Sequence, residues 1–257
     1  MVFEMKKDKL TIKRYDTRAE MGECAAKEAE KVIADIIAKK GQINMIFAAA
    51  PSQNEMLASL LASPMIDWSK VNALHMDEYV GLAEGDSHTF GVYLYEHIFR
   101  HKNFKSIHYI RGYAEDAEAE CARYTKLLEE FPPDVVCLGI GENGHIAFND
   151  PWVADLNDPK MVKIVELDGM CRQQQVNDGC FPTLEDVPTH AITLTVSALT
   201  SAEYMFCVVP APTKANAVKA TVYGPISEDC PASVMRRHEN AVLYCDRDSG
   251  KYLAEGE

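Results

Sequence analysis

The stretch that decides the fold reads VVCLGIGENGHIAFNDP and covers Val135–Pro151. Its first six residues are mostly β-branched or otherwise apolar, which is typical of a short buried strand. Gly139, Gly141 and Gly144 allow a tight turn and a close approach of a ligand to the backbone. Ligands of open α/β sheets bind where the strands end. The stretch therefore predicts a buried strand that opens into a ligand-facing loop.

Apolar runs of the same kind recur along the chain, and longer segments with helical periodicity lie between them. The other expected strands are Ile43–Ala50, Val71–Met76, Ala191–Val196, Tyr204–Val209 and Ala241–Cys245. The expected helices are Ala19–Lys39, Asn54–Ala62, Asp116–Glu130 and Thr213–Val222. Such alternation predicts an α/β fold, a Rossmann-like three-layer sandwich whose central sheet is mostly parallel.

The domain organisation is expected to be simple. A chain of 257 residues fits one α/β domain, so we expect a single domain over residues 1–257. The segment Trp152–Pro188 is the least regular part and is rich in Asp, Gln, Asn and Pro. Long irregular insertions in compact domains often act as lids, so we expect a lid here. A surface excursion without function is the alternative.

Composition excludes several classes of function. The formal net charge is −13, and such a field repels polyanions, so nucleic-acid binding is not expected. A small phosphorylated substrate can still bind in a local basic or amide-rich pocket. No apolar run reaches the ~20 residues that span a bilayer, and MVFEMKKDKL is not a secretory signal. The eight cysteines lack zinc-ligand spacing, so we expect reduced thiols in a cytoplasmic protein.

The loop after Val135–Ile140 carries the first candidate for chemistry. His145 directly follows the three glycines, and an imidazole titrates near neutrality, which suits it to moving protons. Asn143 or Asp150 can orient the ring and set its tautomer. A histidine that serves packing alone is the alternative. The spacing G-x-G-x-x-G also fits a dinucleotide fingerprint, but its mid-chain position without a clean βαβ unit argues against that interpretation.

A second candidate lies at the end of the expected strand Val71–Met76. Asp77 and Glu78 are adjacent, and neighbours on an extended chain point to opposite sides. One carboxylate can therefore enter a cleft as a general base while the other has a structural role. A turn in which Asp77 caps a backbone N–H is the alternative.

Two further loops offer groups that can bind an anion. Lys214 lies in the first turn of the expected helix Thr213–Val222. A cation there opposes the helix dipole, which indicates a phosphate site unless the lysine is simply solvated. Ser52, Gln53 and Asn54 offer donors at the start of another expected helix, where a plain N-cap by Ser52 is the alternative.

Together these segments resemble the glucosamine-6-phosphate deaminase/isomerase family, which is related to the 6-phosphogluconolactonases. The residues that carry the resemblance are MDEYVGL at Met76–Leu82, G-x-G-x-x-GHIAFN at Gly139–Asn149, VP-x-x-AITLT at Val187–Thr195, Lys214, and the segment Ser233–His238. They occur in the family's order over nearly the whole chain. Tyr79 and Ile146–Phe148 favour the deaminase branch, because lactonases usually carry an arginine after the acidic pair.

The resemblance implies a reaction that needs no metal and no cofactor. A hexosamine 6-phosphate ring would be opened by His145 acting at the ring oxygen. Asp77 would then move a proton from C2 to C1, and an enolamine would lose ammonia to give fructose 6-phosphate. The implied catalytic residues are Asp77, His145, Asp150 and Asn143. The implied substrate- and phosphate-binding residues are Ser52, Gln53, Asn54, Glu78, Gly144, Arg172 and Lys214. The partner is a small sugar phosphate, and relatives leave both a monomer and a homo-oligomer open.

The chain departs from the family at the phosphate loop. The family loop reads roughly PTGGTP, whereas Pro51–Met56 reads PSQNEM and places Glu55 near the expected phosphate. Galactosamine 6-phosphate is therefore an alternative substrate. A non-catalytic sugar-phosphate sensor is a second alternative, against which the retention of Asp77 and His145 argues. A lactonase is a third, for which the basic residue after Glu78 is missing.

Overall fold

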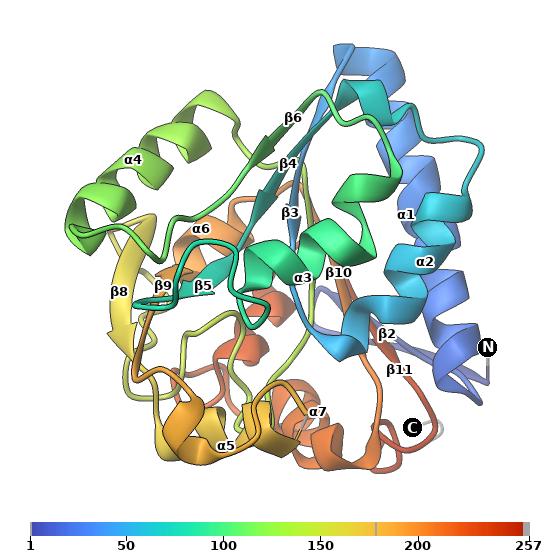
Figure 1. Ribbon diagram of the computed structural model, residues 1–257. Coiled ribbons are helices and arrows are strands. Elements are labelled where there is room, and N and C mark those ends of the chain that lie inside the picture. The colour runs from blue at the N-terminus through green and yellow to red at the C-terminus, as the bar shows by residue number, and fades with distance from the viewer. Residues whose placement is uncertain (1, 178, 254–257) are drawn as a thin grey trace.

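The computed structural model describes residues 2–177 and 179–253 (Figure 1). An eight-stranded sheet forms its centre, in the order β1-β2-β11-β10-β7-β3-β4-β6. The strands are β1 (Phe3–Lys7), β2 (Leu10–Arg14), β11 (Ala241–Cys245), β10 (Tyr204–Val209), β7 (Val135–Leu138), β3 (Ile43–Phe47), β4 (Val71–His75) and β6 (Ser106–His108). From β2 to β6 every neighbouring pair is parallel, and β1 joins β2 as an antiparallel edge. The prediction of a mostly parallel central sheet is confirmed.

Helices cover both faces of this sheet, and β7 shows why. Val135 and Cys137 pack with α1 (Arg18–Lys40), α2 (Asn54–Ala62) and α3 (Phe90–His97). Val136 and Leu138 point to the other face and pack with α4 (Ala117–Glu130), α6 (Val196–Thr200) and α7 (Ala215–Tyr223). A strand with apolar residues on both sides must be covered on both sides. In Figure 1, α1 and α2 lie to the right of β3 and β4, and α4 lies to the left.

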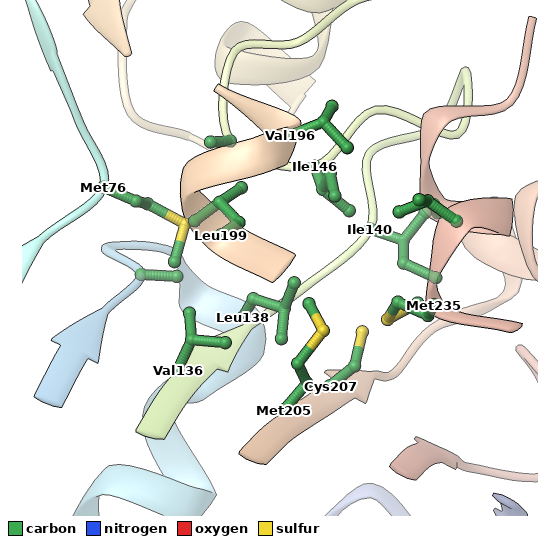
Figure 2. Close-up of a cluster of buried hydrophobic side chains, with 14 of the residues drawn as sticks. Met76, Val136, Leu138, Ile140, Ile146, Val196, Leu199, Met205, Cys207 and Met235 are labelled. Atoms are coloured by element: carbon green, nitrogen blue, oxygen red, sulfur yellow. The ribbon is translucent and has the colours of Figure 1, made fainter. Parts of the chain in front are cut away.

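The buried cluster on the second face is drawn in Figure 2. Val136 and Leu138 of β7 and Met205 and Cys207 of β10 face Leu199 of α6. All five side chains are fully buried. This packing fixes the ends of β7 and β10, from which two of the loops described below emerge. The predicted three-layer sandwich is confirmed.

One strand prediction is wrong in its placement. The run Ala191–Val196 forms β9 (His190–Leu194) but not within the central sheet. It pairs antiparallel with β5 (Asp77–Tyr79) and β8 (Val162–Glu166) in a separate three-stranded sheet. An apolar run predicts a strand without indicating its partner, and β9 pairs where the chain after β4 turns away from the central sheet.

The segment expected to be irregular is more ordered than predicted. Besides β8, residues 152–188 contain α5 (Gly169–Asn177) and a short turn at Leu184–Asp186; residue 178 lies outside the described residues. Among the helices of the described part of the chain, none combines the length and the apolar character needed to cross a membrane.

Candidate active site

One cavity lies where four adjacent strands of the central sheet end. Its walls come from the loops after β3, β4, β7 and β10, which are the loops that the sequence singles out. The lining side chains and backbone from these loops are Ala48–Ser52, Met76, Asp77, Gly139–Gly141, His145, Ala147, Phe148, Pro210, Ala211, Thr213 and Lys214. Parallel strands place their carboxyl ends at one edge of the sheet, so residues more than 130 positions apart meet there.

His145 lines this cavity, and its ring is held through Nδ1 by two neighbouring side chains. The Nδ1 atom lies 2.7 Å from Asn143 Oδ1 and 2.9 Å from Asp150 Oδ1. The amide nitrogen of Asn143 donates to Asp150 at 2.8 Å, so the amide oxygen accepts from His145 and Nδ1 carries the proton. This tautomer makes Nε2 the nitrogen that can exchange a proton with a bound molecule.

Gly141 permits the ring to sit where it does. A Cβ atom at this position would lie 2.1 Å from His145 Cε1 and 2.3 Å from both ring nitrogens. The backbone N–H of Gly141 donates to the His145 carbonyl at 2.9 Å, which closes the loop. The imidazole therefore packs flat against a backbone that only glycine can provide.

Asp77 and Glu78 point to opposite sides, as the alternation along a strand predicts. Asp77 lines the cavity and is 8% exposed. Burial raises the pKa of Asp77 well above its usual range, and the neighbouring Glu78 carboxylate adds to the increase. His75 fixes the turn that carries Asp77, because its Nδ1 donates to the Asp77 carbonyl and its Nε2 accepts from the N–H of Ile110. Burial lowers the pKa of His75 to about 4, so the ring is neutral.

Glu78 does not line the cavity, although the resemblance implies a substrate contact for it. The carboxylate is 3% exposed and accepts hydrogen bonds from the N–H groups of Tyr79, Phe90 and Gly91. Two of these donors belong to the first turn of α3, whose unpaired N–H groups need acceptors. Burial raises the pKa of Glu78 to about 7, although the three hydrogen bonds oppose the increase. Its role is to anchor α3, whose Phe90 lines the cavity.

Asp150 and Asn143 lie behind His145 and outside the cavity lining, so they position the ring rather than touch a ligand. Burial acts to raise the pKa of Asp150, but its contacts with His145 and then Asn143 outweigh burial and hold the pKa below its usual range. His145, Asp150 and Cys171 offer donor atoms within 4.8 Å of one another. Burial raises the pKa of the Cys171 thiol strongly.

Hydroxyl and ammonium groups also line the cavity. Ser52 and Thr213 line it, and Lys214 does so although only 7% of the residue is exposed. Ala211, next in the wall, has φ 84° and ψ 148°, a conformation that favours glycine. Its N–H donates to Asp246 at 2.9 Å. Backbone strain of this kind persists where the surrounding structure holds it, often at functional sites.

Four other predicted binding residues are not brought into the cavity. Gln53 is fully buried and donates to the Leu138 carbonyl at 3.1 Å. Asn54 accepts from the Tyr93 hydroxyl on α3. Gly144 adopts φ 88° and packs against Cys230, whose Sγ would lie 2.8 Å from an added Cβ. Each residue belongs to the right loop, but its side chain or backbone is used to hold that loop.

The fourth is Arg172, which lies on α5 with its guanidinium turned away. It donates to the carbonyls of Leu184 and Val187 at 2.7 and 2.8 Å. These bonds tie α5 to the chain that leads into β9. Instead Gln174 and Gln175 of the same helix line the cavity, and Gln174 accepts from the N–H of Glu142 at 3.0 Å.

Sequence reasoning missed Arg18, which also lines the cavity. Arg18 is the first residue of α1, directly after the N-cap Thr17. A signal was present, because a cation in the first turn of a helix opposes the helix dipole, and the same signal pointed to Lys214. The two glutamines of α5 had no comparable signal, because they fall in the segment whose structure was not predicted.

Comparison with known proteins places this geometry in a family. The family model described as glucosamine-6-phosphate isomerases/6-phosphogluconolactonase matches residues 16–164. A glucosamine-6-phosphate deaminase of Listeria monocytogenes is 37% identical over 213 residues, which cover 83% of this chain and 89% of that protein. One of Bacillus cytotoxicus is 35% identical over 236 residues, with coverage of 92% and 88%.

Solved structures agree with the sequence comparison. A structure described as a monomeric glucosamine-6-phosphate deaminase superposes with a TM-score of 0.84 at 27% identity, and covers 96% of this chain and 99% of that one. A 6-phosphogluconolactonase from Shewanella baltica gives a TM-score of 0.75 at 18% identity, with coverage of 91% and 97%. The second likeness concerns the fold alone.

Proposed function

Because this chain belongs to the family of glucosamine-6-phosphate isomerases and 6-phosphogluconolactonases, we propose that it converts glucosamine 6-phosphate into fructose 6-phosphate and ammonia. The observation that carries the proposal is that Asp77 and His145 line one cavity together with Lys214. A carboxylate and an imidazole provide a proton relay, and the ammonium group provides a site for the phosphate of the substrate.

His145 opens the sugar ring in the first step. The bond between C1 and the ring oxygen breaks, the C1 hydroxyl loses its proton, and the ring oxygen gains one through Nε2. The contacts of Nδ1 with Asn143 and Asp150 support this role. They fix the tautomer and orient the ring, as carboxylate and amide partners do for other catalytic histidines.

Asp77 carries the next proton. Its carboxylate takes the proton from C2 while the aldehyde oxygen O1 gains one, which gives an enolamine. Asp77 then returns its proton to C1 and the nitrogen loses one, which gives an imine at C2. Water then releases ammonia and leaves the ketone of fructose 6-phosphate. The raised pKa of Asp77 supports this double role, because a carboxyl group that titrates closer to neutrality can both accept and return a proton.

The segment 152–188 and the cysteines also fit the proposal. Gln174 and Gln175 extend the cavity wall from α5, so residues 152–188 act as a lid within a single domain. None of the described cysteines forms a disulfide: Cys24, Cys121, Cys137, Cys171, Cys180, Cys207, Cys230 and Cys245. Cysteines outside disulfides suit a reducing compartment, and we place the protein in the cytoplasm.

The test is ammonia release from glucosamine 6-phosphate and from galactosamine 6-phosphate by the purified chain. The account expects release from the first sugar and a loss of roughly 100-fold or more in kcat for Asp77→Asn, because that amide cannot take the C2 proton. Faster ammonia release from galactosamine 6-phosphate would mean that this sugar, and not glucosamine 6-phosphate, is the substrate. No release from either sugar, with the chain folded, would refute the proposal.

A further inference from the structure

Arg18 lines the cavity from helix α1, whereas most of the other lining residues belong to the loops that follow the strands. It is the first residue of α1, and its side chain is 37% exposed at the cavity wall. Its Nε donates to Glu55 Oε1 at 2.6 Å. Its Nη2 donates to the carbonyl of Pro51. Both partners belong to the segment Pro51–Glu55, which replaces the glycine-rich loop expected from the resemblance.

Close packing of α1 against α2 holds this arrangement. A Cβ added at Gly22, one turn further along α1, would lie 2.5 Å from the Cβ of Glu55. Glycine at this point therefore lets α1 approach the start of α2. The short distance between the helices brings the Arg18 guanidinium over the loop that begins at Pro51.

The negative charge of Glu55 explains why a cation is needed at position 18. Glu55 lies in the first turn of α2, three residues after Ser52 of the cavity wall, and an uncompensated carboxylate there would repel an anion. Arg18 neutralises it through the ion pair. A guanidinium has five N–H donors, so it can bond Glu55 and Pro51 and still present donors to a ligand. Lys214 adds an ammonium group to the same cavity, and its charge attracts a phosphate monoester.

We infer that Arg18, held in place by Glu55, is the guanidinium that binds the phosphate of the substrate, together with Lys214 and Ser52. The identity of the sugar in this inference rests on the proposed function. The binding of a phosphate group by Arg18 does not. Arg172 does not line the cavity, and its guanidinium is bonded to the carbonyls of Leu184 and Val187.

The experiment compares three variants with the wild type. Arg18→Ala removes the guanidinium, and Arg18→Lys keeps the charge but loses the planar fork. Arg100→Ala is the matched control, because Arg100 also pairs with a carboxylate, Glu96, but lies outside the cavity lining. Isothermal titration with inorganic phosphate gives a dissociation constant, steady-state kinetics gives KM for glucosamine 6-phosphate, and a thermal melt checks folding.

Arg18→Ala is expected to weaken phosphate binding by roughly 30-fold or more and to raise KM comparably, because a charge-assisted hydrogen bond is lost. Arg18→Lys is expected to fall between Arg18→Ala and the wild type, and Arg100→Ala to equal the wild type. If Arg18→Ala does not fold, Arg18→Lys decides, since it must bind phosphate more weakly than the wild type. Equal phosphate affinity in wild type and Arg18 variants, or no phosphate binding by the wild type, would overturn the inference. If the wild type binds phosphate but releases no ammonia, the proposed function fails and the phosphate titration still decides the role of Arg18.

Discussion

Gly141→Ala should disable the proposed proton relay without touching any ionisable group. The added methyl would lie 2.1 Å from His145 Cε1, whereas ordinary contacts begin at 3.4 Å. The imidazole must therefore move by about 1.3 Å, or the loop must shift by a similar amount. A misplacement of about 1 Å costs roughly 100-fold in rate, so we expect kcat to fall by about 100-fold.

Steady-state ammonia release measures this effect, and KM separates it from a loss of binding. Ser52 and Lys214, which are proposed to bind the phosphate, belong to other loops, so KM should change by less than about threefold. The unfolding free energy should fall by about 1–3 kcal/mol, because the loop is overpacked. Gly169→Ala is the control, since nothing lies within 4 Å of a Cβ at Gly169. A Gly141→Ala variant with wild-type kcat would refute the assigned position of His145.

The remaining predictions concern the groups around the relay. Asp150→Asn should lower kcat by roughly 10–100-fold with little change in KM, because a charged partner of His145 Nδ1 is lost; an unchanged kcat would remove Asp150 from the mechanism. Burial raises the pKa of Glu78 from 4.5 to about 7, so the folded state holds an extra proton between these values. The wild-type unfolding free energy should therefore fall by about 3 kcal/mol as the pH rises through this window. Urea melts of Glu78→Gln should show a smaller pH dependence, and an equal one would contradict the assignment. Arg172→Ala should lower the unfolding free energy by about 1–3 kcal/mol through lost bonds to two carbonyls; a tenfold rise in KM would show instead that Arg172 reaches the substrate.

The central sheet could be predicted because its strands are buried on both faces. β7 and β10 are continuous apolar runs of four and six residues, and β3 is apolar except at Asn44; such runs are a clear signal. The short segments β5, β6 and β8 were missed, because strands of three to five residues carry little pattern. The partner of β9 could not be predicted, because the pairing depends on where the chain leaves the central sheet after β4 and forms β5.

The loops of the site were easier to predict than the side chains within them. Strand ends located the four loops, and the residue types identified Asp77, His145 and Lys214. The direction of a side chain in a loop depends on contacts that are distant in sequence. Asn54 turns toward Tyr93, which lies 39 residues away. Arg172 turns toward Leu184 and Val187 for the same reason, and no local pattern encodes either contact.

The central claim is that this cavity removes an amino group from a sugar phosphate rather than opening a lactone, since the family contains both activities. The most direct measurement compares glucosamine 6-phosphate and 6-phosphogluconolactone with the same purified enzyme. We predict that ammonia and fructose 6-phosphate appear in equal amounts from the amino sugar, while the lactone opens no faster than it does without enzyme. Rapid opening of the lactone with no ammonia from the amino sugar would contradict the account.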